Sequence, residues 1–360
     1  MLKREKKLLE YQLDTEEKVM AAIEKIYSQA LRSINEKIRL YQAEEMTASR
    51  IHHINYQKQL KQQVEAVLEK LHGDEYTTIQ QYLNDTYTDS YVGVMYDLAG
   101  QGVPVIAPVD RKAAVKAIMT DSKISEGLYN ALGVDTRELK KAIRTEITRG
   151  LATGMPYSDI ARTIATVTGA PKSRAKAIVR TEGHRIQEES RQDARMAAKA
   201  KGADIVKQWD AVVDGGTRPN HRKLDGQVRE VDEPFEVNGI KVMCPGKFGN
   251  PAEDCECRCI AHTRARAMMN QRELDRMKKN AEYWGLDKTE DFEEFKRKYL
   301  KAAENAGKKV GSGSVETVNK DATNALLNAY EERRKHFGVK TTPADELRGS
   351  KLNSDRKSVV

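Results

Sequence analysis

The sequence predicts a mainly α-helical protein, with an elongated N-terminal helical region and a small α+β module that contains a short β-rich insertion at about residues 204–261. Charged residues make up 32% of the 360 residues and aromatic residues only 6%, a balance typical of exposed helices. Apolar residues recur at helical spacing over most of the chain, and after Gly202 they alternate as in β-strands. A chain of this length is expected to form several domains.

The N-terminal helical region, residues 1–105, is predicted to hold three helices. The first runs from about Lys7 to Tyr41 without glycine or proline. The second ends at His72-Gly73-Asp74, because glycine is typical of a helix stop and aspartate of a helix start. The third runs to Leu98, and packing in a core or between subunits is the favoured role of its tyrosines, with stacking on bases as the alternative. These tyrosines are Tyr76, Tyr82, Tyr87, Tyr91 and Tyr96.

A central helical segment is expected at residues 106–200. Gly102, Pro104 and Pro108 cannot continue a helix, which predicts an extended connection and a domain boundary near residue 105. Glycine and proline then divide the segment into four predicted helices, with Asp135 and Ser158 as N-caps and Pro171 in a first turn. The predicted helices are Arg111–Met119, Asp135–Leu151, Ser158–Val167 and Lys172–Lys199.

The β-containing module is expected at residues 201–270. Alternation from Ile205 to Val213 predicts a strand, and β-favouring residues around Asn238-Gly239 predict a hairpin. A C-terminal helical segment and flexible tail, residues 271–360, should follow. Helical composition resumes at Thr263 and continues past Trp284 to Ala303, and Ala322–His336 is expected to form a short further helix. The final residues are expected to be loosely ordered.

The module holds the densest set of polar, aromatic and glycine residues in the chain. They follow in the order Arg-Thr-Glu on a long helix, then Trp, Arg-x-x-His-x-x-Leu-Asp-Gly, Pro-Phe and Cys-Arg-Cys. In this order they resemble the phage Mu F-like, or phage head morphogenesis, family over about residues 140–265. The residues that carry the resemblance are Arg180, Glu182, Trp209, Asp214, Arg218, His221, Asp225, Gly226, Pro234, Phe235 and Arg258.

The resemblance implies a minor head protein of a tailed phage, made in the host cytoplasm and present in several copies per virion. Its place would be the interior of the head near the portal, and its role would be in head assembly and in DNA packaging or ejection. The implied partners are the portal protein, packaged double-stranded DNA, and a scaffold or the major capsid protein. The resemblance implies a virion component and no enzyme.

Four cysteines lie within sixteen residues, whereas disulfides that stabilise a secreted chain would be spread along it. The grouping therefore indicates a reducing compartment. Two histidines, His221 and His262, are near in sequence to Cys244, Cys255, Cys257 and Cys259, and all six are acceptable zinc ligands. The Cys-x-Cys spacing argues against a metal, since on a strand such thiols lie about 6.5 Å apart. We therefore expect buried thiols and no cofactor, with zinc as the alternative if the chain bends.

A thiol hydrolase is a further alternative, with Cys257 as nucleophile and His221 as a base beside Asp214 or Asp225. No glycine-rich oxyanion turn, phosphate-binding loop or His-Glu-x-x-His motif accompanies these residues. We instead expect Arg218, His221 and Asp225 to hold an irregular loop through hydrogen bonds. Glu182 is expected to pair with Arg185 or Arg258, and no catalytic residue is predicted.

The chain carries 62 Lys and Arg against 54 Asp and Glu, a net charge of +8 that favours contact with phosphates. Two basic runs stand out, Lys172–Lys199 and Arg258–Lys279. Solvated helices with local charge pairs are the alternative interpretation of such runs. The residues expected to contact DNA, without sequence specificity, are Lys172, Arg174, Lys176, Arg264 and Arg266.

The start of the chain, Met1–Tyr11, is basic but lacks the apolar core of a signal peptide, and no apolar run approaches the length of a membrane span. No span is therefore predicted. Two other functions stay open beside the minor head protein. One is a zinc-dependent DNA-binding module without a capsid role, and the other is a carrier of a phage-delivered enzyme or toxin.

Overall fold

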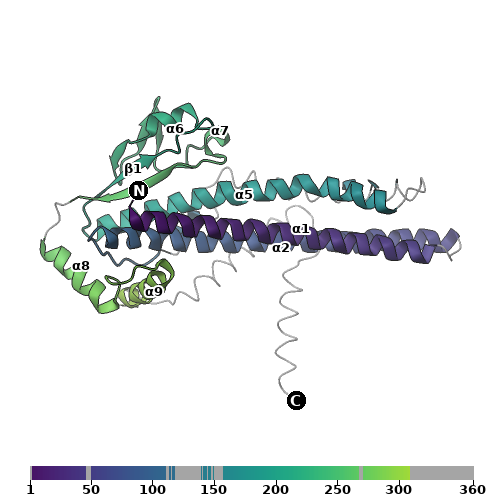
Figure 1. Cartoon of the computed structure of the whole chain (residues 1–360), viewed down its shortest axis with the longest axis horizontal. Coiled ribbons are helices and arrows are strands. Elements are labelled where there is room, and N and C mark those ends of the chain that lie inside the picture. Colours follow the sequence, from purple (N-terminus) through teal and green to yellow (C-terminus); the bar gives the residue numbers. More distant parts are fainter. Residues whose placement is uncertain are drawn as a thin grey trace, which may run out of the picture. The chain divides into compact units, whose positions relative to one another are not determined.

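The computed structural model describes residues 2–45, 50–110, 157–266 and 271–308, with isolated positions between 113 and 149. Its longest elements are the helices α1 (Lys3–Glu45), α2 (Arg50–Gly100) and α5 (Tyr157–Ala200), and the β-strands all lie between residues 205 and 265 in this part of the chain (Figure 1). The prediction of a mainly α-helical protein with a small β-containing module is confirmed.

The chain forms two compact units, and each combines segments that are far apart in the sequence. One contains Met1–Met20, Gln81–Leu128 and Ala177–Asn319. The other contains Ala21–Gln80, Tyr129–Lys176 and Lys320–Val360. The strands fall in the first unit, and so do the named residues that carry the resemblance to the phage family, which begin at Arg180. The part of the resemblance before residue 177 falls in the other unit. The domain boundaries expected at residues 105, 200 and 270 stay predictions.

Two predicted helix breaks are wrong. α2 continues through Gly73, and α5 continues through Gly169 and Pro171, so that Pro171 lies inside a helix. An interior glycine costs about 1 kcal/mol relative to alanine and a proline about 3 kcal/mol. Apolar burial continues on both sides of each break, at Leu71 and Ile79 around Gly73 and at Ile164 and Ala175 around Pro171, and this packing outweighs the local cost. Ser158 lies in the first turn of α5, not before it.

The core of the first unit is formed by α1, α2 and α5 together with two short C-terminal helices, α8 (Gln271–Trp284) and α9 (Phe292–Lys308). Tyr91 and Tyr96 of α2 belong to this core, and Tyr82 and Tyr87 are also buried, so packing is confirmed for these four and they are not exposed for stacking on bases. The rings of Tyr96 and Phe295 meet edge to face with centroids 5.1 Å apart. The side chain of Tyr76 lies outside the described residues. The buried tyrosines are Tyr82, Tyr87, Tyr91 and Tyr96.

The C-terminal helices differ from the prediction. Residues after Thr263 continue a strand, and helix α8 begins only at Gln271. Gly285 then ends α8 in a left-handed conformation (φ +65°), which is typical of helix C-termini. The predicted helix Ala322–His336 and the tail lie outside the described residues, as do Asp135 and most of the predicted helices Arg111–Met119 and Asp135–Leu151.

Gly183 on α5 lies where Tyr82 of α2 packs against the helix backbone. A Cβ atom at residue 183 would lie 2.4 Å from the Tyr82 hydroxyl oxygen and 2.7 Å from its Cε1. We expect Gly183→Ala to lower the free energy of unfolding by about 2 kcal/mol, because overpacking outweighs the gain in helix propensity. Urea denaturation would measure the change. Gly169→Ala is the matched control, since nothing lies within 4 Å of its added Cβ, and it should be neutral or stabilising. Equal stabilisation by both substitutions would contradict the close contact.

The β-containing module consists of a three-stranded antiparallel sheet and a hairpin. The sheet has the order β2 (Val228–Glu230), β1 (Ile205–Asp210), β5 (Ile260–Ala265). The hairpin joins β3 (Phe235–Val237) to β4 (Ile240–Val242), with Asn238 at φ 51° and Gly239 at φ 79°. Positive φ at both turn residues is what a tight two-residue hairpin requires, so the predicted turn is confirmed. Two short helices, α6 (Pro219–Leu224) and α7 (Pro251–Asp254), complete the module.

Side chains from helices occupy the edge of β5 that faces away from β1. The backbone N–H of Ala261 donates to Glu188 Oε2 (3.1 Å), and its carbonyl accepts from Arg195, both on α5. Gln101, which follows α2, donates to the carbonyl of Thr263 (2.9 Å) and accepts from the N–H of Ala265 (2.8 Å). Four backbone groups on alternate residues of this edge are thereby satisfied without a further strand.

Candidate functional site

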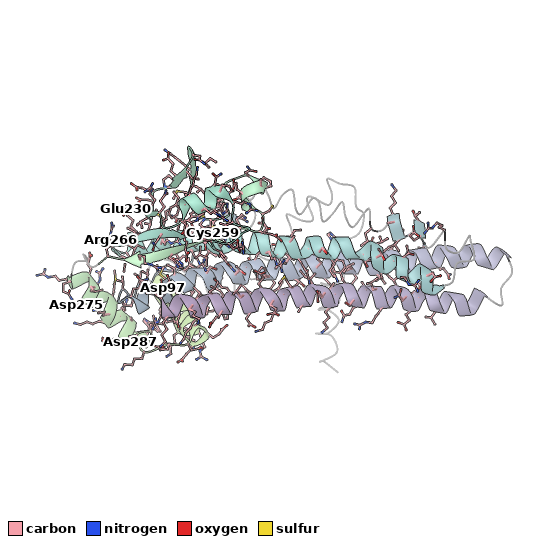
Figure 2. All side chains as sticks on the ribbon, turned by 45° about the horizontal axis from the view of Figure 1, so that its top comes forward. Asp97, Glu230, Cys259, Arg266, Asp275 and Asp287 are labelled. Carbon is pink, nitrogen blue, oxygen red and sulfur yellow. The ribbon has the colours of Figure 1, made fainter. Side chains whose placement is uncertain are left out.

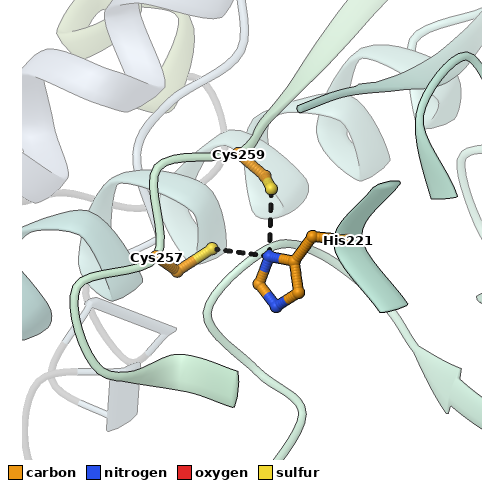
Figure 3. A group of neighbouring side chains, drawn as sticks. All are labelled: His221, Cys257 and Cys259. Carbon is orange, nitrogen blue, oxygen red and sulfur yellow. Dashed lines mark hydrogen bonds between the residues drawn. The ribbon is translucent and has the colours of Figure 1, made fainter. Parts of the chain in front are cut away.

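Three chemically reactive side chains of the module meet in one buried cluster. His221, on α6, directs its Nδ1 toward two sulfur atoms, 3.1 Å from Cys259 Sγ and 3.7 Å from Cys257 Sγ (Figure 3). The candidate ligand atoms all lie within 4.8 Å of one another. The exposed fractions of His221, Cys257 and Cys259 are 2%, 4% and 3%, so the cluster is closed to solvent.

The chain bends immediately before the two cysteines. Glu256 has a positive φ of 51°, which is uncommon for a residue other than glycine, and the N–H of Cys257 donates to the carbonyl of Asp254 (3.2 Å). Strand β5 begins only at Ile260, after Cys259. The two sulfurs lie within 4.8 Å of each other, so the separation of about 6.5 Å used against a metal is wrong, and both thiols face the same histidine.

The His221 ring is held on all sides. It stacks on Phe248 with a centroid separation of 5.0 Å and an interplanar angle of 16°, and it meets Trp209 edge to face. Its Nε2 lies 3.0 Å from Glu253 Oε2. Asn220 in turn donates to Glu253 Oε1 (2.8 Å), so the carboxylate is itself oriented. His221 therefore presents Nδ1 to the sulfurs and Nε2 to a carboxylate.

The cluster favours negative charge on one sulfur and positive charge on the histidines. A hydrogen bond with Cys259, supported by His184 and His221, lowers the pKa of the Cys257 thiol far below its usual value. The pKa of Cys259 is raised in turn by Cys257 and by burial. Burial would lower the pKa of His221, but its contacts with Cys257 and Glu253 raise it overall. A thiolate beside imidazole nitrogens is the resulting arrangement.

The other three predicted ligands lie apart from this cluster. Cys244 is buried, and burial raises the pKa of its thiol to about 12. Cys255 is half-buried, and its carbonyl accepts a hydrogen bond from Arg218. His262 lies between two carboxylates, with Nε2 2.7 Å from Asp210 Oδ2 and Nδ1 2.9 Å from Glu5 Oε1. Of the six predicted ligands, the structure brings His221, Cys257 and Cys259 together.

Glu5 and His262 belong to a second polar cluster that includes Asp97. Burial alone would raise the pKa of Glu5, but hydrogen bonds with His262 and Arg264 hold it at about 2. The pKa of Asp97 is raised to about 7, because Asp97 is buried and lies near the negative Glu5. Gln101 donates to Asp97 Oδ2 (2.8 Å), whereas Oδ1 is buried and has no hydrogen-bond partner in the described part of the chain.

Replacing Asp97 by asparagine should stabilise the protein in a pH-dependent way. The pKa of Asp97 is higher in the folded protein than its ordinary 3.8, so the folded state binds the proton more tightly and loses stability as pH rises from about 4 to about 7. Asp97→Asn removes this loss. We expect both proteins to unfold similarly at pH 4, and the variant to be more stable by roughly 2 kcal/mol above pH 7. Chemical denaturation across this range would measure it, with exposed Asp287→Asn as control. A pH-independent difference would contradict the assignment.

The predicted pairing of His221 with Asp214 or Asp225 is wrong. Asp214 forms two hydrogen bonds with Arg258 at the surface (2.7 and 2.8 Å), which lower the pKa of its carboxyl group, and Asp225 accepts from the N–H of Ala211 (2.9 Å). Arg218 donates to the carbonyls of Glu253 (3.1 Å) and Cys255 (2.6 Å). Each of these three polar residues holds a loop of the module through hydrogen bonds.

The remaining motif residues build the module's core and turns. Trp209 and Phe235 are fully buried and meet edge to face, with ring centroids 5.1 Å apart. Pro234 is half-buried immediately before β3. Gly226 has a φ of 76°, and its N–H donates to the carbonyl of Trp209 (2.9 Å), a turn that favours glycine.

Helix α5 presents Arg180 and Glu182 in different environments, as their spacing predicts. Glu182 is fully buried and pairs with Arg185 (2.9 Å), one of its two predicted partners. Arg185 also pairs with Glu189 (2.7 Å) and donates to the carbonyl of Ala117 (2.9 Å). Arg180 is half-exposed and lies 3.6 Å from Glu16. The α5 segment of the motif thus has a structural role in the first unit.

Comparison with known proteins identifies the segment that contains this cluster. Residues 141–262 match the family model described as Phage Mu protein F like protein. This segment belongs to the phage Mu F-like family. No solved structure matches the chain.

Two curated relatives extend beyond the Mu F-like domain. The minor head protein GP7 of Bacillus phage SPP1 is 32% identical over 183 residues, which are 50% of this chain and 57% of that protein. The NAD(+)–arginine ADP-ribosyltransferase EFV of Enterococcus faecalis is 29% identical over 237 residues, which are 65% of this chain and 49% of that protein. The chain therefore matches only around half the length of these relatives.

Three of the five basic residues predicted to contact DNA have acidic partners in the protein. Lys176 pairs with Glu24, and Arg264 pairs with Glu5. Arg266 reaches from the end of β5 to Glu230 of β2 and to Asp204 (2.6 and 2.7 Å), and Figure 2 shows Arg266 beside Glu230. Lys172 is half-buried, and the side chain of Arg174 lies outside the described residues. These ion pairs compete with phosphate contacts at the same groups.

Sequence reasoning missed four residues of the Mu F-like domain that shape the cluster: His184, Phe248, Glu253 and Asp254. Asp254 accepts hydrogen bonds from the N–H groups of Phe248, Gly249 and Asn250, which closes the loop before α7. The sequence Asn250-Pro251 is a typical helix start and is the one local signal that points to this region.

None of the described helices has the length and apolar character of a membrane span.

Proposed function

We propose that this protein is a minor head protein of a tailed bacteriophage, located in the virion, and that it binds the portal protein inside the head and acts in head assembly. The observation that carries the proposal is the Mu F-like segment 141–262, together with its similarity to a minor head protein of phage SPP1. The polar residues of the motif support a structural role, since Arg218, Asp225 and Glu182 are engaged in internal hydrogen bonds and ion pairs.

Co-expression with the portal protein of the same phage tests the proposal. Size-exclusion chromatography with mass determination, at low and at raised salt, should give a complex that survives raised salt and contains several copies of the chain. The portal protein of an unrelated phage is the control. A chain that elutes alone with its own portal protein at both salt concentrations would contradict the proposal. Scaffold and major capsid proteins, added to the same co-expression, are the further partners that the proposal includes.

The proposed part in DNA packaging or ejection is non-specific contact with double-stranded DNA. The net charge of +8 supports it, and the internal ion pairs of Lys176, Arg264 and Arg266 limit it. We therefore expect weak binding of a duplex of any sequence, lost between low and physiological salt with a shallow dependence on salt concentration. Retention of DNA at raised salt, without portal binding, would favour a free DNA-binding module instead.

We further propose that the chain has no catalytic activity of its own. The relative with an enzyme's name is matched over 49% of its length, and nothing in its name assigns the activity to the matched half. Incubation with labelled NAD(+) and arginine-rich acceptor proteins should transfer no label. Transfer above that of heat-inactivated protein would overturn this and would favour the enzyme-carrier alternative.

A further inference from the structure

We propose that His221, Cys257 and Cys259 bind a structural zinc ion, with His184 as the fourth ligand. Thiolate sulfur and imidazole nitrogen are the donor types of structural zinc sites, and four-coordinate tetrahedral geometry is their rule. The site is independent of the portal-binding role, because it rests on the donor atoms and their surroundings alone.

The donor distances already approach those of a metal site. A tetrahedral zinc with bonds of about 2.3 Å to sulfur and about 2.0 Å to nitrogen holds its ligand atoms roughly 3.3 to 3.8 Å apart. His221 Nδ1 lies 3.1 Å from Cys259 Sγ and 3.7 Å from Cys257 Sγ, and the two sulfurs lie within 4.8 Å of each other. Movements of at most about 1 Å would admit the ion between these three atoms.

Glu253 supplies the outer contact that such a histidine requires. Histidine ligands of metals usually direct their second ring nitrogen to a carboxylate or carbonyl, which fixes the ring and its tautomer. His221 Nε2 lies 3.0 Å from Glu253 Oε2, within the distance of an ion pair but not aligned for a hydrogen bond, and Asn220 fixes the other carboxylate oxygen. This arrangement leaves Nδ1, the nitrogen that faces the sulfurs, as the free donor.

His184 is the fourth side chain available to the ion. It lies on α5 and interacts with the Cys257 thiol, and its Nε2 is buried with no hydrogen-bond partner in the described ranges. Gly246 packs against this ring, since a Cβ there would lie 3.4 Å from His184 Cδ2. His184 lies outside the tight three-residue group, so its ring must shift toward the ion when zinc binds. Zinc would then join α5, α6 and the segment before β5.

Metal analysis of the full chain, purified without chelator, is the first test. We expect about one zinc per chain by mass spectrometry of the elements. Replacement by Co²⁺ should give the visible absorption of a tetrahedral site and a thiolate charge-transfer band. A folded protein that lacks metal, and that takes up none when refolded with excess zinc, would overturn the proposal. This measurement needs no variant, so it does not depend on the folding of a mutant.

Substitutions then locate the site. Cys257→Ser and Cys259→Ser should each weaken zinc binding at least 100-fold, measured by competition with a chromophoric chelator. Cys255→Ser is the matched control, because Cys255 lies two residues away but outside the cluster, and it should keep full metal content. Equal zinc in Cys257→Ser and Cys255→Ser proteins would overturn the assignment.

Two further variants test the roles of the neighbouring side chains. His184→Gln should weaken binding and change the Co²⁺ spectrum, whereas an unchanged spectrum would overturn its role as the fourth ligand. Glu253→Gln should lower the affinity about 10-fold, as expected for a positioning residue. Glu253→Asp should recover part of this loss, and unfolding of the metal-free protein should be unaffected by the Gln substitution.

Discussion

Trp209→Ala is expected to lower the free energy of unfolding by about 4 kcal/mol, the typical loss when a large buried aromatic side chain is removed. Trp209 is fully buried on β1, and its ring contacts Phe235, Phe248 and His221 edge to face. The cavity would open between the sheet and the hairpin. Denaturant unfolding followed by circular dichroism would measure the loss.

Tyr283→Ala is the control for this prediction. It makes the same kind of truncation at an aromatic residue that is 80% exposed, so the stability should hardly change. A Trp209→Ala protein as stable as the Tyr283→Ala protein would mean that the module does not pack around Trp209.

Arg195→Met is expected to lower the free energy of unfolding almost as much as Trp209→Ala. Arg195 is fully buried on α5 and donates to the carbonyl of Ala261, to Thr263 Oγ1 (3.1 Å) and to Gln192 Oε1 (3.2 Å). Burial lowers the pKa of its guanidinium to about 10, which reflects the cost of keeping the charge there. Methionine fills much of the space but leaves the carbonyl of Ala261 and Thr263 Oγ1 without the donor that Arg195 supplies, while Glu188 keeps its ion pair with Arg191. We expect a loss of about 3 kcal/mol in denaturant unfolding.

Arg258→Met provides the comparison. Arg258 pairs with Asp214 at the surface, where water and salt screen the charges, so this substitution should leave stability within experimental error. If both substitutions had equal effects, the buried position of Arg195 would be irrelevant, and the account of β5 held by α5 would fail.

The long helices could be predicted from their apolar spacing, but their breaks could not. Gly73 and Pro171 are local stop signals, and sequence reasoning weighs them without knowing what lies across from them. Buried residues on both sides of each signal, such as Leu71 and Ala175, pack against other parts of their own unit and keep the helix continuous. The break at Gly285, where the backbone takes a left-handed conformation, was missed because composition stays helical on both sides.

For the candidate site, the sequence supplied the residue types and a wrong geometry. His221 and the cysteines were identified from their chemistry, but the spacing of a regular strand predicts Cys257 and Cys259 sulfurs about 6.5 Å apart, and they lie within 4.8 Å. The bend at Glu256 depends on a positive φ in a residue that seldom adopts it, so local propensity could not reveal it. His184 is separated from Cys257 by more than seventy positions, and only the fold brings the two together.

Side chains cover the outer edge of β5, and this matters for a protein that we expect to act in several copies per virion. An open strand edge is a template on which a second chain can extend a sheet, and crowded copies would find it readily. Glu188, Arg195 and Gln101 already satisfy the groups that an incoming strand would need. Crowding of identical subunits therefore does not favour the addition of a strand from another copy at this edge of β5.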